Sequence, residues 1–286
     1  MPVSKIIIAM KRAYIEITNR CNLSCAFCMK HNRSYKDMSL QEFEHVVKEV
    51  KPYTDFLYFH VQGEPLLHKE INELFDITDK ENCHVQLVTN GSLLKDHMDL
   101  YKRPSLRKIS FSLQSIEYQA NTEAIPFLET ILVFCKNASE YGKFCEIRFW
   151  RDDQADMPKT KACMDYLAQH FTLDETNRNN SLKLMEKVYL SYNNSFSWPD
   201  ILEKMETYEG TCHGGIDQIA ILSDGTVVPC CLDCQGNIPL GNIFETPLKE
   251  ILQSERYQNL IKGFRNHKIT EPLCQKCTYR LRFSHR

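Results

Sequence analysis

The sequence predicts an α/β fold of parallel strands joined by helical crossovers, followed by a smaller C-terminal region. Strand-like and helix-like patterns alternate about six times between residues 10 and 195. Six such units are too few for an eight-fold barrel, so the strands form an open sheet or a barrel, full or partial. At 286 residues the chain is long enough for a large domain and a smaller one. We place the boundary near Trp198-Pro199, giving domains over 1–198 and 199–286.

The strands are expected where β-branched and aromatic residues gather in short apolar runs. These runs cover residues 13–18, 56–59, 84–88, 108–113, 144–149 and 188–192. Ser39 and Glu42 form a capping box before an apolar repeat at helical spacing, which predicts a helix there. Further helices are expected through Ile71 and Leu74 and from about Pro126 onward. The polar stretch 174–181 predicts a surface loop.

Composition narrows the class of protein. Lysine and arginine number 35 against 37 aspartates and glutamates, and no basic block stands out, so neither nucleic acid nor an anionic membrane is implied as a partner. We see no signal-peptide core and no membrane span, which predicts a cytoplasmic protein. In that reducing compartment, thirteen cysteines favour metal or redox chemistry over a disulfide scaffold.

Three cysteines, Cys21, Cys25 and Cys28, follow the first expected strand in one short loop. Three thiolates at this spacing can hold three corners of an iron–sulfur cube and leave the fourth iron open for chemistry. Zinc is the main alternative, although no fourth ligand lies at a suitable offset nearby. Inert buried thiols are the third possibility, which the clustering makes a poor explanation.

Polar residues and turns also follow the later strands, where the reactive groups of parallel α/β folds gather. Gln62-Gly63-Glu64-Pro65 follows the second strand and Thr89-Asn90-Gly91 closes the third; taken alone, both are turns. At the end of the fifth strand, Arg148 and Arg151 are candidates for a bidentate grip on a carboxylate, although exposure to solvent is the commoner fate of arginine.

A second set of cysteines lies in the C-terminal region, at positions 212, 230, 231, 234, 274 and 277. A predicted hairpin with an Asp224-Gly225 turn separates Cys212 from Cys230 and brings them close together. A helix starting at Thr246-Pro247 then leads the chain to the last pair. Four thiolates gathered in this way suit zinc or a second iron–sulfur cluster, and the residues alone do not separate the two.

The three-cysteine loop, with Phe27 as the aromatic residue before the last cysteine, resembles the signature of the radical S-adenosylmethionine enzymes. The resemblance covers roughly residues 10 to 195 and implies a partial (β/α)6 barrel. It also implies a [4Fe-4S] cluster whose open iron is chelated by the methionine part of S-adenosylmethionine. In the family, one electron from this cluster cleaves the sulfonium to a 5′-deoxyadenosyl radical, which takes a hydrogen atom from the substrate.

The resemblance also implies contacts to the cofactor. Gly63, Glu64 and Pro65 match the family's motif of two glycines, glutamate and proline, which receives the methionine ammonium group, and Gln62 replaces the first glycine. The remaining positions match by their place at strand ends: Thr89 and Asn90 resemble the ribose-side element, and Ser112 resembles the serine that hydrogen-bonds the ribose. Gln114 stands where many relatives carry an acidic residue, and its role is open.

The C-terminal region resembles the twitch domain, the shortened form of the SPASM domain, which implies a small α+β fold with one auxiliary [4Fe-4S] cluster. The ligands implied are Cys212, Cys230, Cys274 and Cys277. Cys231 and Cys234 are spare, and either is able to replace one of the four. The other cysteines, at 83, 135, 145 and 163, are expected to be small core residues.

Within the family, the cysteine layout is most similar to that of 2-deoxy-scyllo-inosamine dehydrogenases, which favours a two-electron oxidation with the auxiliary cluster as electron acceptor. The alternatives are a maturase that modifies a ribosomally made peptide and a non-catalytic iron–sulfur or zinc protein. About twenty residues precede Cys21, so we expect no fused peptide-recognition domain. The family also implies an external electron donor, such as flavodoxin or ferredoxin, and the substrate is either a small molecule or a peptide.

Overall fold

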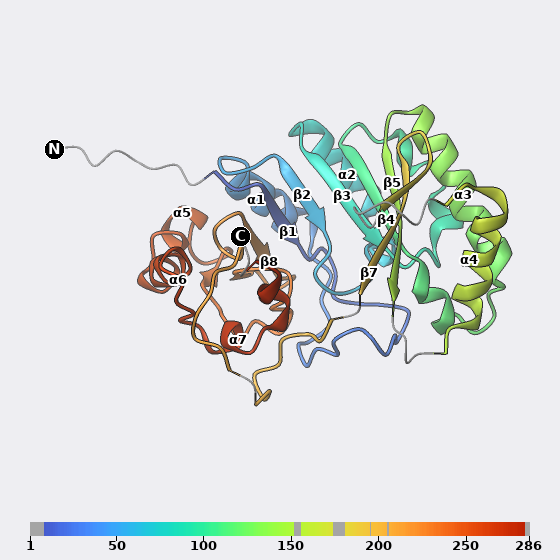
Figure 1. Cartoon of the computed structure of the whole chain (residues 1–286). Helices are drawn as coiled ribbons and strands as arrows, with labels where there is room; N and C mark the ends of the chain where they lie inside the picture. The colour runs from blue at the N-terminus through green and yellow to red at the C-terminus, as the bar shows by residue number, and fades with distance from the viewer. Residues whose placement is uncertain (1–8, 152–155, 174–180, 195, 205, 284–286) are drawn as a thin grey trace.

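The computed structural model describes residues 9–151, 156–173, 181–194, 196–204 and 206–283. One ten-stranded sheet runs through it in the order β10-β9-β8-β1-β2-β3-β4-β5-β7-β6. Six neighbouring strands are parallel, as predicted: β1 (Arg12–Ile15), β2 (Phe56–Phe59), β3 (His84–Thr89), β4 (Leu106–Ser112), β5 (Phe144–Arg151) and β7 (Val188–Asn194). The sheet is curved and open, which confirms a partial barrel (Figure 1).

Four helices pack against this sheet: α1 (Leu40–Val50), α2 (Ile71–Lys80), α3 (Ala124–Glu140) and α4 (Pro158–His170). Figure 1 shows α2, α3 and α4 along the outer side of the strands. The predicted capping box is present, since the Ser39 hydroxyl accepts from the backbone N–H of Glu42 while the Glu42 carboxylate accepts from that of Ser39. Its apolar repeat then turns Phe43, Val46 and Val47 into the core.

The link between β3 and β4 differs from the prediction of a helical crossover. It contains two short 3-10 turns, η2 (Leu94–His97) and η3 (Leu100–Lys102), instead of an α-helix. Gly91, Pro104 and scattered apolar residues leave too few consecutive positions at helical spacing there. Leu94 and Leu100 still reach the core, so the turns cover this part of the sheet in place of a helix.

The core lies between the sheet and the helices. Alternate residues of β3, Val85, Leu87 and Thr89, are buried, as the period of two requires. The four cysteines expected in the core are buried too, at positions 83, 135, 145 and 163, which confirms their assignment as small core residues.

The sixth parallel strand carries an additional partner that the sequence reading missed. β6 (Ser181–Met185) pairs antiparallel with β7 at one edge of the sheet. The predicted surface loop 174–181 lies outside the described residues up to 180, and Ser181 already belongs to β6. Lys187, with a positive φ of 57°, closes the short turn between the two strands.

The predicted C-terminal hairpin is present and extends the main sheet. β8 (Gln218–Ile221) pairs parallel with β1 and antiparallel with β9 (Thr226–Val228), and β10 (Gly241–Asn242) completes that edge. Gly225 adopts a φ of +87° in the predicted Asp-Gly turn. The chain then forms three helices, α5 (Leu248–Ile251), α6 (Glu255–Arg265) and α7 (Pro272–Gln275). The sequence predicted a single helix there, beginning where α5 lies. Ser254 caps α6 and separates it from α5.

The C-terminal helices gather beyond β8, on the β1 side of the sheet, whereas α3 and α4 flank β4 and β5 (Figure 1). Among the described residues, none of the helices combines the length and hydropathy of a membrane span.

Candidate functional site

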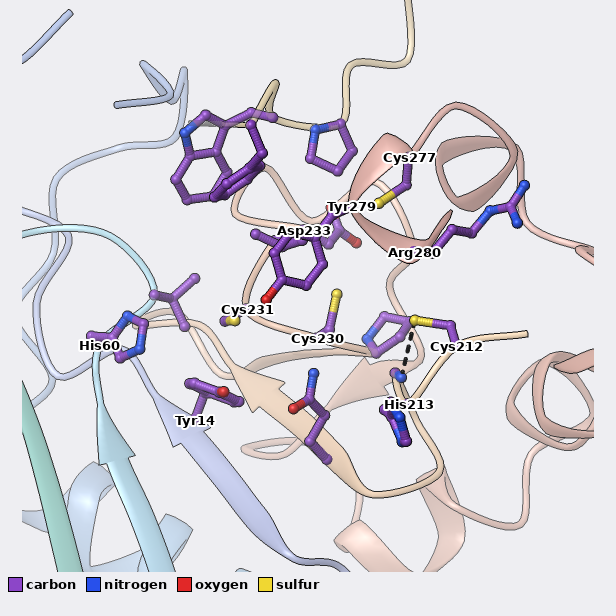
Figure 2. A pocket seen from close by; sticks show the side chains of 18 of the residues that line it. Tyr14, His60, Cys212, His213, Cys230, Cys231, Asp233, Cys277, Tyr279 and Arg280 are labelled. Atoms are coloured by element: carbon purple, nitrogen blue, oxygen red, sulfur yellow. Dashed lines mark hydrogen bonds between the residues drawn. The ribbon is translucent and has the colours of Figure 1, made fainter. Parts of the chain in front are cut away.

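A cavity of about 720 Å³ lies at the carboxyl ends of the parallel strands and extends to the C-terminal helices. Its walls include Cys28 from the first cysteine loop, Ser112 and Arg148 from β4 and β5, and five of the six cysteines of the second set. Figure 2 shows Tyr14 and His60 on one side of it and Cys212, Cys230 and Cys277 on the other. Residues separated by more than two hundred positions in the sequence therefore face one space.

The first three cysteines lie together in the loop after β1. The backbone N–H of Cys28 donates to the Cys25 carbonyl (3.3 Å), which forms a tight turn within the loop. Burial and, to a smaller extent, the charges of the neighbouring Cys21 and Cys28 sulfurs raise the pKa of Cys25 to about 12. Three thiolates this close together would repel one another, so the cysteines are more stable as neutral thiols. Binding to iron displaces their protons. The clustering predicted from the sequence is thus present in space.

Two strand ends hold this loop in place. The backbone N–H of Glu64 donates to the Arg20 carbonyl at 2.7 Å. Gly63 has a φ of +79°, and a Cβ there would lie 2.4 Å from the Thr18 carbonyl oxygen, so only glycine fits this close approach. The Gly63-Glu64 segment consequently packs backbone to backbone against the residues that precede Cys21.

The Glu64 carboxylate is buried and already bound by protein donors. It accepts from the Leu66 backbone N–H (3.0 Å), the Thr89 hydroxyl (2.7 Å) and the Asn90 backbone N–H (2.7 Å). Burial raises the pKa of Glu64 to about 7, and these three hydrogen bonds oppose that rise. Glu64 therefore joins the segment that follows β2 to the end of β3. Its contact with an ammonium group of the cofactor stays a prediction.

Asn90 lies beside the cysteine loop, and its predicted role toward the ribose stays a prediction. Its side-chain amide donates to Asn22 (3.0 Å) and approaches the Cys21 sulfur (3.8 Å). The Phe27 ring packs edge-on against Tyr118, and the Phe27 carbonyl accepts from the indole N–H of Trp198 (2.9 Å). Pro65 begins the short 3-10 turn η1 (Pro65–Leu67), away from the cavity.

Two buried amide atoms near the cavity lack hydrogen-bond partners within the described part of the chain: Gln62 Nε2 and Gln114 Oε1. Both side chains are nine-tenths buried or more. Ser112 and Gln114 lie together at the end of β4, in the cavity wall. Unpaired buried polar atoms cost free energy, so they indicate a polar group that completes the site. A polar cofactor such as S-adenosylmethionine fits this side of the cavity.

The hairpin brings Cys212 and Cys230 together as predicted. A Cβ added to Gly214 would lie 3.5 Å from the Cys230 Cβ and 3.7 Å from the Cys212 sulfur. Burial raises the pKa of Cys274, and so does the negative charge of Cys212 and Cys277. All four residues implied by the family resemblance therefore lie within electrostatic reach of one another, and a set of four thiolates fits an iron–sulfur cluster.

The two spare cysteines lie on the barrel side of this set. Figure 2 shows the Cys231 sulfur near Tyr14 and His60, away from the Cys212 and Cys277 sulfurs. Cys234 is 1% exposed and packs with Tyr14 and Val61. Cys231 nevertheless lies within electrostatic reach of Cys230, so the choice of Cys212, Cys230, Cys274 and Cys277 as ligands stays a prediction. In the described residues, no group of three or more His, Cys, Asp or Glu side chains is arranged to hold a single metal ion.

An ion pair joins the two cysteine regions. Arg33 donates to both oxygens of the fully buried Glu16 carboxylate (2.6 and 2.7 Å) and to the Cys234 carbonyl (2.8 Å). The backbone N–H of Ser223 also donates to Glu16 (3.0 Å). Because each polar atom of the carboxylate is paired, the charge is tolerated in the interior. This network holds the segment after Cys230 against the loop that follows the first cysteines.

Sequence reasoning missed the side chains on β1 and after β2 that line the cavity. Arg12 stacks over Tyr58 at 5.3 Å, and the ring of His60 meets that of Tyr14 edge-on at 5.2 Å. Burial and, to a smaller extent, the positive charge of Arg148 lower the pKa of His60 to about 3, so the imidazole is neutral at pH 7. The signal available was their place at strand ends, which also identified Arg148.

Arg148 lies in the cavity wall, as the reading of β5 suggested, and its guanidinium stacks over Trp150 at 5.8 Å. Arg151 ends β5, and its side chain lies outside the described atoms.

Comparison with protein families matches two segments of the chain. The model described as the radical SAM superfamily matches residues 15–148, and an iron–sulfur cluster-binding domain named SPASM matches residues 212–278. The first segment contains the three-cysteine loop and the strand ends described above. The second contains the hairpin and all six C-terminal cysteines.

Among curated proteins, the chain is similar to GTP 3′,8-cyclase of Aquifex aeolicus, with 28% identity over 133 residues. That match covers 44% of this chain and 42% of the cyclase. The probable GTP 3′,8-cyclase of Methanococcus maripaludis (strain C6) is 30% identical over 107 residues, or 36% of each chain. The chain thus matches less than half the length of these relatives.

Solved structures share the fold over most of the chain. BtrN in complex with AdoMet and 2-DOIA has a TM-score of 0.55 at 17% identity, covering 94% of this chain and 93% of that one. Streptococcus suis SuiB bound to precursor peptide SuiA has a TM-score of 0.61 at 15% identity, covering 94% and 71%. The anSMEcpe structure with AdoMet and the Cp18Cys peptide has a TM-score of 0.58 at 18% identity, covering 96% and 90%.

Proposed function

Because the chain belongs to the radical S-adenosylmethionine superfamily and carries a SPASM-type iron–sulfur domain, we propose that it oxidises a substrate held in the cavity between its two cysteine sets. Its cofactors are S-adenosylmethionine, the [4Fe-4S] cluster that binds it, and auxiliary iron–sulfur. We assign the first cluster to Cys21, Cys25 and Cys28, and the auxiliary cluster to Cys212, Cys230, Cys274 and Cys277. These assignments follow the two domains, which we place at residues 1–198 and 199–286.

The observation that carries this proposal is the shared cavity. Cys28 and the C-terminal cysteines line the same space, and Trp198 closes part of it by bonding to the Phe27 carbonyl. When bound, the cofactors supply a 5′-deoxyadenosyl radical at one side of this space and an electron acceptor at the other. A substrate between them is placed for loss of a hydrogen atom and then an electron, which is a net two-electron oxidation.

The side chains of β1 and β5 shape the substrate space. Tyr14 and His60 offer polar atoms on one wall, and Arg148 offers a guanidinium whose only described stacking partner is Trp150. His60 is neutral at pH 7, so it adds no charge beside Arg148 and offers its ring nitrogens for hydrogen bonds to the substrate. We assign the methionine and ribose parts of S-adenosylmethionine to Phe27 and Ser112, which line the cavity, and to the strand-end segments that carry Gly63, Glu64, Pro65, Thr89 and Asn90.

Closure of the second set by four cysteines supports the oxidation. With each corner held by a thiolate, that site has no open iron for substrate, which suits electron transfer and not substrate ligation. The positions of Cys231 and Cys234 support the same view, since both lie on the barrel side of the four sulfurs. An external one-electron donor such as flavodoxin or ferredoxin is required by this scheme.

A second candidate function is modification of a peptide. The folds of SuiB and anSMEcpe have been solved with peptides bound, and this chain shares those folds. Its sheet is open, with the short strand β10 at one edge and β6 at the other, and an edge strand is able to pair with an extended peptide. The oxidation and the peptide modification share the radical step and differ in the product.

Release of 5′-deoxyadenosine by the reduced protein tests the radical step. We expect release by the wild type and none above background by Cys25→Ala, because the loop then lacks one of its three thiolates. Equal release by both proteins would remove the three-cysteine loop from the mechanism. Zinc with little sulfide in anaerobically prepared protein would instead support a non-catalytic metal protein.

Deuterium transfer tests the substrate. Deuterated small molecules and peptides are incubated with the reduced protein, and deuterium in 5′-deoxyadenosine marks the compound attacked. A dehydrogenase yields a product two hydrogens lighter, whereas a cross-linking maturase yields a modified peptide. Transfer from peptides alone would favour the second candidate function.

A further inference from the structure

Gln62 occupies an unusual position beside the first cysteine loop. It stands where the family resemblance leads us to expect glycine, yet its side chain is 7% exposed and points at a cysteine. The Cys28 thiol donates to its amide oxygen at 3.3 Å, while its amide nitrogen is buried without a hydrogen-bond partner in the described ranges. One half of the amide is thus satisfied and the other is not.

The backbone around Gln62 keeps the side chain in this place. Gly63 is locked by its positive φ and by the Thr18 carbonyl, and Glu64 is bonded to the Arg20 carbonyl at 2.7 Å. Since these contacts join the two strand-end loops, Gln62 moves with the cysteine loop and not independently of it. The amide group is therefore a fixed neighbour of the Cys28 sulfur.

We propose that the Gln62 side chain donates an N–H···S hydrogen bond to the Cys28 thiolate of the first cluster and raises the reduction potential of that cluster. A thiolate bound to iron has no proton to donate, so the amide oxygen would face a second acceptor. Rotating the amide by 180° exchanges oxygen and nitrogen within nearly the same shape. The rotation also gives the orphaned nitrogen a partner.

The mechanism is electrostatic. A hydrogen bond to a cluster thiolate withdraws negative charge from the sulfur and stabilises the reduced, more negative cluster. Glycine, the residue expected at this position, has no side chain to make such a bond. Gln62 thus distinguishes this chain's first cluster from that of relatives with the two-glycine motif.

Cys234 completes the arrangement on the other side of Gln62. Cys234 is 1% exposed; burial raises the pKa of its thiol, and the nearby Gln62 amide acts in the opposite direction. In the rotated amide the oxygen faces away from Cys28 and accepts from the Cys234 S–H, which is a weak donor. This positioning role accounts for a buried cysteine that the auxiliary set does not use.

The test is the reduction potential of the first cluster. It is monitored through the part of the electron paramagnetic resonance (EPR) signal that responds to S-adenosylmethionine. Gln62→Leu keeps the volume and removes the donor. We expect the equilibrium constant for reduction of its first cluster to fall about tenfold, which lowers the reduction potential by about 59 mV for a one-electron couple. Cys234→Ala should shift it less in the same direction. Gln119→Leu, which removes another buried amide that bonds to Asn90 and Ser115, should leave it unchanged.

A potential in Gln62→Leu equal to that of wild type would overturn the inference. Should that variant fail to assemble its cluster, spin-echo measurements on wild-type protein labelled with 15N-glutamine decide the matter. An amide nitrogen coupled to the reduced cluster is expected, and its absence contradicts the hydrogen bond. The inference rests on the proposed function's assignment of the first cluster, which Cys25→Ala tests separately. Survival of the S-adenosylmethionine-sensitive signal in Cys25→Ala would refute the assignment of the first cluster, and the Gln62 proposal would fall with it. An unchanged potential in Gln62→Leu would refute the Gln62 proposal alone.

Discussion

The two cysteine regions differ in how the chain assembles them. Cys21, Cys25 and Cys28 come from a single loop of eight residues. Cys212, Cys230, Cys274 and Cys277 come from three segments that a hairpin and two helices bring together. The first set needs only a local turn to form, whereas the second needs the C-terminal fold.

The surroundings of the two sets differ as well. Unpaired amide atoms of Gln62 and Gln114 lie near the first set, and its space opens toward polar strand ends. The second set contains enough thiols to close its own coordination. The comparison indicates that one site is built to bind a further molecule and the other to be self-contained.

The largest expected effect separates the two sites by function. Cys25→Ala should abolish release of 5′-deoxyadenosine, because the loop retains only two thiolates. Cys274→Ala should lose about half of the iron, as one of two four-iron clusters is lost, and still release 5′-deoxyadenosine. Iron, sulfide and nucleoside are measured on the same anaerobic samples. Loss of release in both variants, with folding intact by circular dichroism, would show that the two sites do not act separately.

The link between the regions provides the next largest effect. Arg33→Ala leaves the fully buried Glu16 carboxylate without its partner, and such losses cost about 3–5 kcal/mol. Arg20→Ala is the matched control from the same stretch, since its ion pair with Asp37 is largely exposed and worth about 0–1 kcal/mol. The free energy of unfolding is measured by urea denaturation. Equal losses in the two variants would contradict a role for Glu16 and Arg33 in joining the regions.

A backbone substitution tests the close packing of the first site. Gly63→Ala forces a Cβ to within 2.4 Å of the Thr18 carbonyl at a φ of +79°, and we expect a cost above 2 kcal/mol with poor cluster assembly. Gly142→Ala has nearly the same φ, +76°, and meets only the end of the Lys187 side chain at 3.4 Å. Its cost should be about 1 kcal/mol. Thermal denaturation and iron content distinguish strain alone from strain plus collision.

The two cysteine regions also differ in how much of each could be predicted from the sequence. The spacing of Cys21, Cys25 and Cys28 is local, so it indicated the first site directly, and short apolar runs rich in β-branched and aromatic residues located all six parallel strands. The C-terminal hairpin was visible from Asp224-Gly225, but its pairing with β1 was not, because nothing in a hairpin's own pattern specifies which strand its outer edge will meet.

Cavity-lining residues were harder to find for a related reason. Tyr14 belongs to a strand-like run whose composition fits an ordinary core, and His60 directly follows another, so only the structure shows that both face the open space. The shortened crossover between β3 and β4 was missed because the pattern elsewhere alternates so regularly. Gln62 stood out as a departure from a motif, while its contact with Cys28 required the structure.

The smallest expected effect concerns pH. Burial opposes ionisation of Asp217, but hydrogen bonds from Lys11 and His213 outweigh it and lower the pKa of this carboxyl below its usual value. A carboxyl whose pKa is lower in the folded protein stabilises the fold at pH values above its pKa in the unfolded chain. This stabilisation is lost as the pH falls through its pKa in the folded protein. Asp217→Asn should cost about 0.2–1 kcal/mol at pH 7, and this cost should shrink as the pH falls below the unfolded value of about 3.9 and through the lower folded value. A cost that grows as the pH falls through this range would contradict the lowered pKa of Asp217.

We propose that one of the two clusters binds S-adenosylmethionine and that the other does not. The most direct measurement is the EPR spectrum of the reduced wild-type protein before and after S-adenosylmethionine is added. We predict that one of two cluster signals changes, and that Cys25→Ala lacks the signal that changes while Cys274→Ala retains it. Two signals that both respond, or a responsive signal that survives in Cys25→Ala, would contradict the account.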